Sequence, residues 1–582
     1  MKRRDDLEVL IVGAGPTGLS MAQLLARQGI RVRAISRHRG TAHTPRGHIT
    51  NARTMEVLRD MGLEPRAREL AMPQALMRHS QWATQLADGE VLASLDSWGA
   101  GPERLPEYQR ASPCAPCNLH QHRLEPLLRD AAQGAGARVD FEQEFLSLSQ
   151  DEEGVRAELR DLRSGEVYEL RARYLVAADG ANSRVATQLG VSMDDELVLG
   201  TAISCWIEAD LSPWVADRPG ALYWLSALHA ERGVQCATLV NVEPWHQWMM
   251  AFGVPPDQIE AELQPAALLA RARAVIGDAS VPIAIRDVSR WTVRRAVASR
   301  MRVGRVFLAG DAAHRHPPTN GLGTNTSIQD SFNLAWKLAL VLRGQAADSL
   351  LDSYEAERLP VARAVVHRAM ESSFEMHAMF EAIGLYPGLP SEAAAMTLAG
   401  LKASSPEGEA RRARLQQALT LQNYQLNALG IEMGQWYERG AVVGAGPRPA
   451  GDADPILHYQ PHAVAGAPLP HAWLQRGGQR CSTLDLVGHG RWVLLCGAEA
   501  GPWRQAAQRL FEDRGLGLTV ISIGPDAEVQ DVEGNWLTLA QAGPSTAWLV
   551  RPDRHIAWRS DSAEQAFEQL DQVMNQLLGP QQ

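Results

Sequence analysis

A glycine-rich turn near the start of the chain is the feature that most constrains its fold. Gly13, Gly15 and Gly18 follow the spacing Gly-x-Gly-x-x-Gly, between an apolar run at residues 9–12 and a helical pattern at residues 19–26. In such a unit the first glycine allows a tight bend, the second lets the backbone approach a pyrophosphate, and the third lets the helix pack closely. The helix N-terminus then faces the phosphates. The turn therefore predicts a dinucleotide-binding α/β unit.

The second strand of this unit ends without the acidic residue that usually binds a ribose hydroxyl about 20 positions after the turn. The chain has Ser36 there, followed closely by Arg37 and Arg39. Two interpretations stay open at this point. The serine hydroxyl contacts the ribose of FAD, or the arginines bind the 2′-phosphate of NADP.

Two further stretches favour FAD. Apolar runs at residues 174–178 and 305–309 are followed by Asp179 and by Gly310 and Asp311, so each run reads as a strand that ends in a carboxylate. Either aspartate alone is as well explained by a turn or a helix cap. The two together make that explanation much weaker.

A second glycine-rich segment follows the later aspartate. Gly321, Gly323 and Asn325 lead into residues 330–341, where apolar residues recur at helical spacing. The N-terminus of that helix would stabilise negative charge on a reduced flavin by about 0.3–2 kcal/mol.

With these stretches in place, the chain resembles the single-component FAD-dependent aromatic hydroxylases. The resemblance is to the phenol-hydroxylating branch that includes 2-hydroxybiphenyl 3-monooxygenase and 2,4-dichlorophenol 6-monooxygenase. Residues 44–59, 330–338 and 549–553 carry it, so it spans essentially the whole chain.

The resemblance implies flavin contacts at Gly13, Gly15, Gly18, Arg46, Gln121, Asp311 and Asn325. Together with the residues read from the motifs, the predicted cofactor-binding set is Gly13, Gly15, Gly18, Ser36, Arg37, Arg46, Gln121, Asp179, Gly310, Asp311, Gly321, Gly323 and Asn325. No metal ligands are predicted.

His48 is the predicted catalytic residue. Its arginine-bracketed stretch alone favours a surface or structural role, as for most of the 17 histidines, and only the resemblance makes it the acceptor of the phenol proton. Histidine suits that task because its unperturbed pKa is about 6.5. A phenolate ring is richer in electrons than a phenol and so attacks an activated oxygen atom more readily.

Trp224, Pro318 and Thr319 are the predicted substrate contacts, and Trp224 is among them because the resemblance places an active-site tryptophan there. The sequence departs from the family at two places nearby. Val240 stands where a relative carries an arginine, and Thr319-Asn320 replaces the more usual pair before Gly321.

The implied reaction uses NAD(P)H and O2 to hydroxylate a phenolic ring ortho to its hydroxyl, through a flavin C4a-hydroperoxide. Only one nucleotide fingerprint is present, so NADH or NADPH is expected to bind transiently while FAD stays bound. Two alternatives remain open. One is an FAD-linked NAD(P)H reductase or dehydrogenase without oxygen insertion, and the other is a protein whose tail makes it chiefly a binding or assembly partner.

Composition sets limits on location and partners. The chain has 582 residues, 45% hydrophobic and 21% charged, which is globular and enough for two to four domains. A net charge of -10 disfavours nucleic acid and anionic membranes as partners. Residues 1–6 lead directly into the first strand without a signal-peptide core, and six cysteines suit a reducing compartment. We expect a cytoplasmic homo-oligomer, a dimer or a tetramer.

One cysteine pattern is interpreted as incidental. Cys114 and Cys117 are followed by His120 and His122, but a structural zinc site would have a second, distant pair of ligands.

The predicted fold is α/β: a Rossmann-like FAD-binding domain interleaved with a sheet-rich substrate domain, plus a C-terminal thioredoxin-like domain without a Cys-x-x-Cys motif. The predicted ranges are 1–75, 115–190 and 300–380 for the FAD-binding domain, 76–114 and 191–299 for the substrate domain, 381–450 for a helical connection and linker, and 451–582 for the C-terminal domain.

Overall fold

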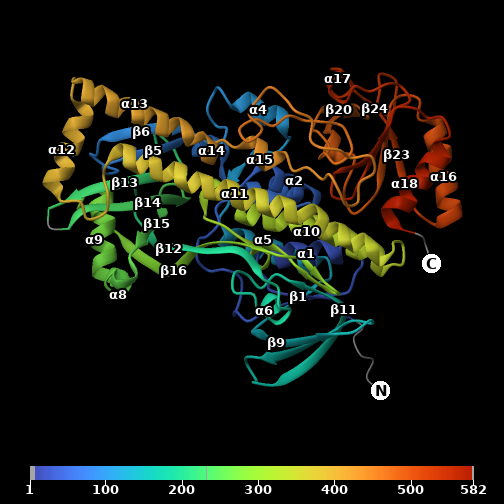
Figure 1. Cartoon of the computed structure of the whole chain (residues 1–582), viewed down its shortest axis with the longest axis horizontal. Coiled ribbons are helices and arrows are strands. Elements are labelled where there is room, and N and C mark those ends of the chain that lie inside the picture. Colours follow the sequence, from blue (N-terminus) through green and yellow to red (C-terminus); the bar gives the residue numbers. More distant parts are fainter. Residues whose placement is uncertain (1–6, 231, 580–582) are drawn as a thin grey trace.

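The computed structural model describes residues 7–230 and 232–579. The expectation about the segment before the first strand therefore lies outside the described residues. Figure 1 shows an elongated molecule in which the C-terminal region lies at one end and the helices α12 and α13 at the other. A single long helix, α11 (Asp352–Ile383), runs between these ends.

The first sheet is the mainly parallel sheet that the glycine-rich turn predicts. In spatial order its parallel strands are β18 (Val306–Leu308), β11 (Val167–Ala177), β1 (Leu7–Val12), β2 (Val32–Ser36) and β8 (Arg138–Phe141). The antiparallel strands β17 (Arg302–Val303), β10 (Val155–Asp161) and β9 (Gln143–Gln150) extend it. The central strands β1 and β18 and the end of β11 are apolar runs because they are buried.

Three helices pack together beside this sheet. The helix α1 (Pro16–Ala26) contacts both α5 (Gln121–Gly134) and α10 (Gly323–Leu342). The helices α5 and α10 therefore begin near the glycine-rich turn, although 100 to 300 residues separate them from it in the sequence.

The second sheet is formed mainly by the segment between β11 and β18. In spatial order its strands are β19 (His314–Arg315), β16 (Ala284–Ala298), β12 (Met193–Glu208), β15 (Gln247–Val254), β14 (Gly233–Glu243), β13 (Leu222–His229), β5 (His79–Ala83) and β6 (Val91–Asp96). Strands from residues 79–96 join strands from residues 193–298, as the interleaved prediction requires.

Different helices cover the two faces of the second sheet. One face packs against α9 (Pro265–Ile276), next to the short α8 (Ile259–Glu262). The other face meets α11 and the helices α12 (Ser391–Lys402) and α13 (Pro406–Leu421). A small sheet of β3 (Ile49–Thr50), β7 (Cys117–Asn118) and β4 (Met72–Pro73) lies where the two large sheets meet.

Short helices complete these two units. They are α2 (Ala52–Asp60), α3 (Glu64–Leu70), α4 (Leu105–Ala111), α6 (Arg184–Gln188), α7 (Ser212–Val215), α14 (Asn423–Leu426) and α15 (Leu429–Met433). Within the described ranges, no helix is both long and apolar enough to cross a membrane.

The C-terminal region has a four-stranded sheet in the order β23 (Thr519–Ser522), β22 (Val493–Cys496), β25 (Ala547–Val550) and β26 (Ile556–Ser560). The pair β22–β23 is parallel, and β25 and β26 follow antiparallel. Its helices are α16 (Gly501–Arg514), α17 (Asn535–Ala540) and α18 (Ala566–Leu578), and a small sheet is made by β20 (Trp473–Arg476), β21 (Gln479–Ser482) and β24 (Val529–Gln530). The order β23-β22-β25-β26 is the strand order expected of a thioredoxin-like domain. The thioredoxin-like assignment and the domain boundaries stay predictions.

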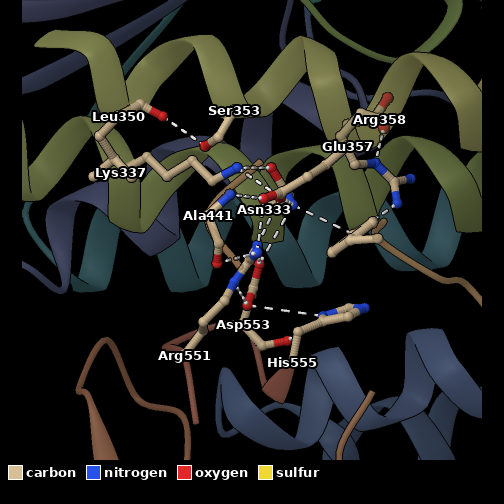
Figure 2. Close-up of polar contacts among 12 residues, drawn as sticks. Asn333, Lys337, Leu350, Ser353, Glu357, Arg358, Ala441, Arg551, Asp553 and His555 are labelled. Atoms are coloured by element: carbon tan, nitrogen blue, oxygen red, sulfur yellow. Dashed lines mark hydrogen bonds and ion pairs between the residues drawn. The ribbon is translucent and has the colours of Figure 1, made fainter. Parts of the chain in front are cut away.

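A buried charge cluster ties the C-terminal region to the long helices. Both oxygens of Glu357 on α11 accept hydrogen bonds from Arg551, at 2.7 and 2.8 Å, and Lys337 on α10 lies 2.7 Å from Glu357. Asp553 pairs with Arg551 from the same loop. Figure 2 shows these side chains meeting between the two helices and the loop. The 549–553 motif therefore has a packing role.

Candidate active site

Four parallel strands of the first sheet end at the same edge, where α/β folds bind ligands. Their ends carry the glycine-rich turn after β1, Ser36 in β2, Asp179 after β11 and Gly310 after β18. A cavity of about 560 Å³ opens at this edge, within the range of cofactor pockets. Seven of the predicted cofactor residues line it: Gly13, Gly15, Ser36, Arg37, Arg46, Gln121 and Asp179.

The glycine-rich turn fits a pyrophosphate. Gly13 has φ +112°, and a Cβ atom there would lie 2.0 Å from the backbone oxygen of Ala178. A Cβ atom on Gly18 would lie 1.9 Å from the oxygen of Gly13, so Gly18 lies beneath the turn and does not line the cavity. Gly15 faces the cavity and begins α1 without a side-chain cap. The helix N-terminus is therefore available to phosphate oxygens.

Ser36 and Asp179 stand on either side of the turn. The Ser36 hydroxyl accepts a hydrogen bond from the backbone N–H of His38, at 3.3 Å, and still borders the cavity. One oxygen of Asp179 accepts from the backbone N–H of Val185, at 3.2 Å, near the start of α6. Burial raises the pKa of Asp179. Asp179 thus serves as a helix cap and as a wall of the cavity.

Arg46 and Gln121 are held together at one wall of the cavity. The backbone N–H of Gln121 donates to the backbone oxygen of Arg46, at 2.9 Å, and the Gln121 side chain donates to Glu125, at 2.6 Å. The Arg46 side chain is exposed. These contacts hold the start of α5 against the loop that carries His48.

A buried carboxylate, that of Asp330, holds the backbone of the Gly310-Asp311 turn. Asp330 on α10 accepts from the backbone N–H of Gly310, at 3.0 Å, and contacts His314, at 2.7 Å, and Arg358, at 2.8 Å. A Cβ atom on Gly310 would lie 2.4 Å from Thr17 on α1. Asp311 is left with its side chain exposed, beyond the end of β18.

The second glycine-rich segment meets the His48 loop. The Asn325 amide donates to the backbone oxygens of Ile49, at 2.8 Å, and Gly321, at 2.6 Å, and its oxygen accepts from the N–H of Asn51, at 3.0 Å. A flavin contact by Asn325 would therefore use its backbone. A Cβ atom on Gly321 would lie 2.8 Å from Ile49, and α10 begins at Gly323 without a side-chain cap.

The contacts of His48 determine its tautomer. Its Nδ1 atom lies 3.1 Å from Oδ1 of Asn118, and the Nδ2 group of Asn118 donates to the backbone oxygen of Asn241, at 2.8 Å. Because a carbonyl only accepts, Asn118 must turn its NH2 group to Asn241 and its oxygen to His48. Nδ1 of His48 therefore carries the proton, and Nε2 has a free lone pair.

The pKa of His48 differs from the value of about 6.5 that the sequence analysis used. Burial of the ring lowers it to about 4, and the hydrogen bond to Asn118 offsets only part of this effect. The ring of His120 stacks on His48 at 5.5 Å between centroids, and burial lowers its pKa as well. His48 is thus neutral at pH 7 and accepts hydrogen bonds, but it is a weaker base than an exposed histidine.

The three predicted substrate contacts lie in different surroundings. Trp224 stacks on Trp82, with centroids 4.5 Å apart, in the face of the second sheet that also packs against Ile49. Pro318 is exposed, whereas Thr319 is buried and donates its hydroxyl to Ala369 on α11, at 2.6 Å. Their roles in binding a substrate stay predictions.

Sequence reasoning missed Asn118 and Asn241. Asn118 lies in the segment interpreted only as a loop before α5, and Asn241 is one residue after Val240. Neither belongs to a motif. Only the pairing of β7 with β3, at Asn118 and Ile49, brings the amide to His48.

Comparison with known proteins gives two family matches. The FAD binding domain family model matches residues 6–369, and the model described as aromatic-ring hydroxylase, C-terminal, matches residues 462–581.

Similar proteins cover the chain end to end. The 2,4-dichlorophenol 6-monooxygenase of Delftia acidovorans is 42% identical over 562 residues, 95% of each chain. The phenol 2-monooxygenase of Pseudomonas sp. (strain EST1001) is 39% identical, over 96% of this chain and 90% of that one. The crystal structure of the flavin-dependent monooxygenase PieE in complex with FAD and substrate has a TM-score of 0.94 at 42% identity, covering 99% of this chain and all of that one. The structure of aklavinone-11 hydroxylase with FAD and aklavinone has a TM-score of 0.80 at 30% identity, covering both chains fully.

Proposed function

The chain belongs to the FAD-dependent aromatic-ring hydroxylases, and on that premise we propose that His48 accepts the proton of a phenolic substrate that this enzyme hydroxylates ortho to its hydroxyl. The enzyme is an FAD-dependent monooxygenase of phenols, with NAD(P)H as co-substrate. The observation that carries the assignment to His48 is its tautomer, because Nε2 is left as an acceptor, and Asn325 of the second glycine-rich segment binds the backbone oxygen of the next residue, Ile49.

When bound, FAD passes electrons from NAD(P)H to oxygen and supplies the activated oxygen atom. The chain's own residues bind and orient it. Gly13 and Gly15 at the start of α1 would hold the pyrophosphate, and Ser36 the ribose. The N-terminus of α10 at Gly323 would favour negative charge on the reduced ring.

His48 would act on the substrate hydroxyl. Its Nε2 lone pair accepts the hydrogen bond from the phenol, and proton transfer to it raises the electron density of the ring during oxygen attack. The Asn118 oxygen keeps the other ring nitrogen protonated throughout. Because the pKa of His48 is about 4, we expect the proton to move late, as the oxygen atom attacks, and not to rest on His48 beforehand.

The FAD-linked reductase without oxygen insertion is not favoured. The similar proteins described above are named monooxygenases or hydroxylases, and each matches nearly the whole length of this chain. Val240, which stands where a relative carries an arginine, lies on the sheet face that packs near Ile49 and leaves that wall apolar.

We also propose a cytoplasmic location and a homo-oligomeric state. All six cysteines are unpaired, which suits a reducing compartment. Light scattering behind a sizing column would decide between a monomer and a dimer or tetramer.

The proposed function is tested by oxygen and NAD(P)H consumption with a panel of phenols, with hydrogen peroxide measured in parallel. We expect about one oxygen per NAD(P)H, little peroxide and a hydroxylated product for the accepted phenols. In His48→Ala, we expect product formation to fall about 100-fold or more, the usual range for loss of a general base.

His367→Ala is the control, because that histidine is exposed on α11. Peroxide as the sole oxygen product for every phenol would refute the hydroxylase. An unchanged product yield in His48→Ala would refute the role of His48.

A further inference from the structure

The register of the second sheet places a set of side chains on the face toward the FAD-binding unit. On the central strand β14, Ala237 and Leu239 point into the core against α9. Because side chains alternate along a strand, Cys236, Thr238 and Val240 point to the opposite face. Val240 and Cys236 indeed pack in the cluster that contains Ile49.

Neighbouring strands continue this face. Thr238 lies between Trp224 on β13 and Ala251 on β15, and Ala251 pairs in turn with Ser204 on β12. Val240 lies between Leu222 and Met249, and Met249 pairs with Trp206. Most of these side chains are apolar. Thr238 and Ser204 add two hydroxyl groups, and that of Ser204 accepts a hydrogen bond from Nε1 of Trp291, at 3.0 Å.

The face is open, although it lies in the middle of the sheet. Ala237 and Leu239 are 6% and 0% exposed, whereas Cys236, Thr238 and Val240 are all partly exposed. Ser204, Trp206 and Ala251 are partly exposed as well. Leu222, Trp224 and Met249 on this face are buried, so water-sized space lies above the partly exposed side chains between them, while the other face of β14 is sealed.

One end of this open face is the His48 end. Asn241 follows Val240, and its backbone oxygen holds Asn118, which in turn holds His48. The other end is closed by helices, because Cys236 packs in the same cluster as Met379 of α11 and Leu401 of α12. From Val240 to Cys236 the strand rises by four residues, or about 13 Å.

A single phenol ring whose hydroxyl meets His48 would leave the Cys236 end of this face empty. We propose that this end is a second subsite, formed by Cys236 and Thr238, which binds a further aromatic ring of the substrate carrying a hydrogen-bonding oxygen. The proposal rests on the proposed function and narrows its substrate class to phenols of two or more rings. Thr238 supplies the polar contact, since its side chain is partly exposed and its hydroxyl has no hydrogen bond to any other described residue, whereas the Cys236 thiol lies 3.5 Å from the hydroxyl of Ser226.

The test is a binding titration of the FAD-loaded enzyme without NAD(P)H, followed by quenching of tryptophan fluorescence. The probes are phenol, 1-naphthol and 1,5-dihydroxynaphthalene, which add one ring and then a distal hydroxyl. We expect 1-naphthol to bind at least about tenfold more tightly than phenol, from the apolar surface of the second ring.

Two variants separate this subsite from general hydrophobic binding. Cys236→Phe fills the far end, so the Kd of 1-naphthol should rise to near that of phenol while the Kd of phenol stays unchanged; Cys236→Ala is the matched control and keeps the preference. Thr238→Val keeps the shape and removes the hydroxyl, so only 1,5-dihydroxynaphthalene should lose affinity, by about threefold or more.

Equal affinity for phenol and 1-naphthol in the unaltered enzyme would overturn the proposal, as would equal weakening of both by Cys236→Phe. If Cys236→Phe does not fold, Thr238→Val decides, and an equal effect on both naphthols would overturn the proposal. Selective binding without oxygen insertion would refute the proposed function and leave the subsite standing.

Discussion

The Nδ1 atom of His48 lies 3.1 Å from the Oδ1 atom of Asn118, an oxygen that carries no charge. A histidine in this position keeps its tautomer but gains little stabilisation of its protonated form. Burial therefore holds the pKa of His48 at about 4.

We predict that Asn118→Asp raises the pKa of His48 by placing a carboxylate beside the ring. The base works only when neutral, so the acid limb of kcat/KM should move from about pH 4 toward pH 6–7. The measurement is the pH dependence of kcat/KM for one accepted phenol. Asn118→Ala is the companion variant, and it should lower kcat without moving the limb upward. An acid limb that is unchanged in Asn118→Asp would show that His48 does not set the pH profile.

We predict that Gly13→Ala abolishes FAD binding. The added Cβ atom would lie 2.0 Å from the backbone oxygen of Ala178, at a φ of +112° that alanine rarely adopts. Either the turn or the end of β11 must shift, and both border the cavity. The purified variant should be colourless, as measured by flavin absorbance per protein. Gly29→Ala is the control, because Gly29 also has a positive φ but nothing lies within 4 Å of its added Cβ atom. Equal flavin content in both variants would contradict this account.

The glycine-rich turn could be predicted as a strand–turn–helix unit because its parts are local in the sequence. The strand, the turn and the start of α1 are consecutive, so spacing alone indicates Gly13, Gly15 and Gly18. The family and the phenol hydroxylase activity, which the resemblance implied, are confirmed by the comparisons.

The substrate half could not be predicted in the same way, because its geometry comes from pairings between distant strands. Asn118 reaches His48 across 70 residues, and Asn241 reaches Asn118 across 123. The open face of β14 is recognised only because Cys236, Thr238 and Val240 are partly exposed while the residues between them are buried, which the sequence does not show. The lowered pKa of His48 also needs the tertiary structure, because it results from burial.

We predict that the folded protein loses stability as the pH falls from about 6.5 to 4. Burial lowers the pKa of His471 in the C-terminal region to about 4, and His48 and His316 have the same direction and size of shift. In this window the unfolded chain binds more protons than the folded one, so the free energy of unfolding rises with pH and is lost on acidification. Each such histidine contributes a slope of at most about 1.4 kcal/mol per pH unit.

The measurement is the thermal midpoint at pH 7, 6 and 5. His471→Asn removes one titrating group outside the active site, so its midpoint should fall less between pH 7 and 5 than that of the unaltered protein. His367→Asn, at an exposed position, should leave the pH dependence as it was. If the thermal midpoint of His471→Asn fell more between pH 7 and 5 than that of the unaltered protein, the prediction that protonation of His471 destabilises the folded state would be wrong.

We predict that Arg551→Ala lowers the free energy of unfolding by about 3–5 kcal/mol, because it leaves the buried carboxylates of Glu357 and Asp553 short of their principal partner. Although burial alone would raise it, Arg551 and Lys337 keep the pKa of Glu357 below its usual value. The loss should therefore be largest at neutral pH, where Glu357 is charged. The measurement is denaturant unfolding at pH 7.

Arg66→Ala is the control for Arg551→Ala, because Arg66 pairs with Glu69 at the surface with both side chains about 60% exposed. Such a pair contributes about 0–1 kcal/mol. Lys337 lies on α10, the helix that begins at Gly323, and the N-terminus of this helix faces the proposed flavin position. Loss of the charge cluster should therefore also weaken FAD binding. A loss of stability in Arg551→Ala no greater than in Arg66→Ala would mean that the C-terminal region is held by its apolar contacts, and FAD affinity would then be unchanged as well.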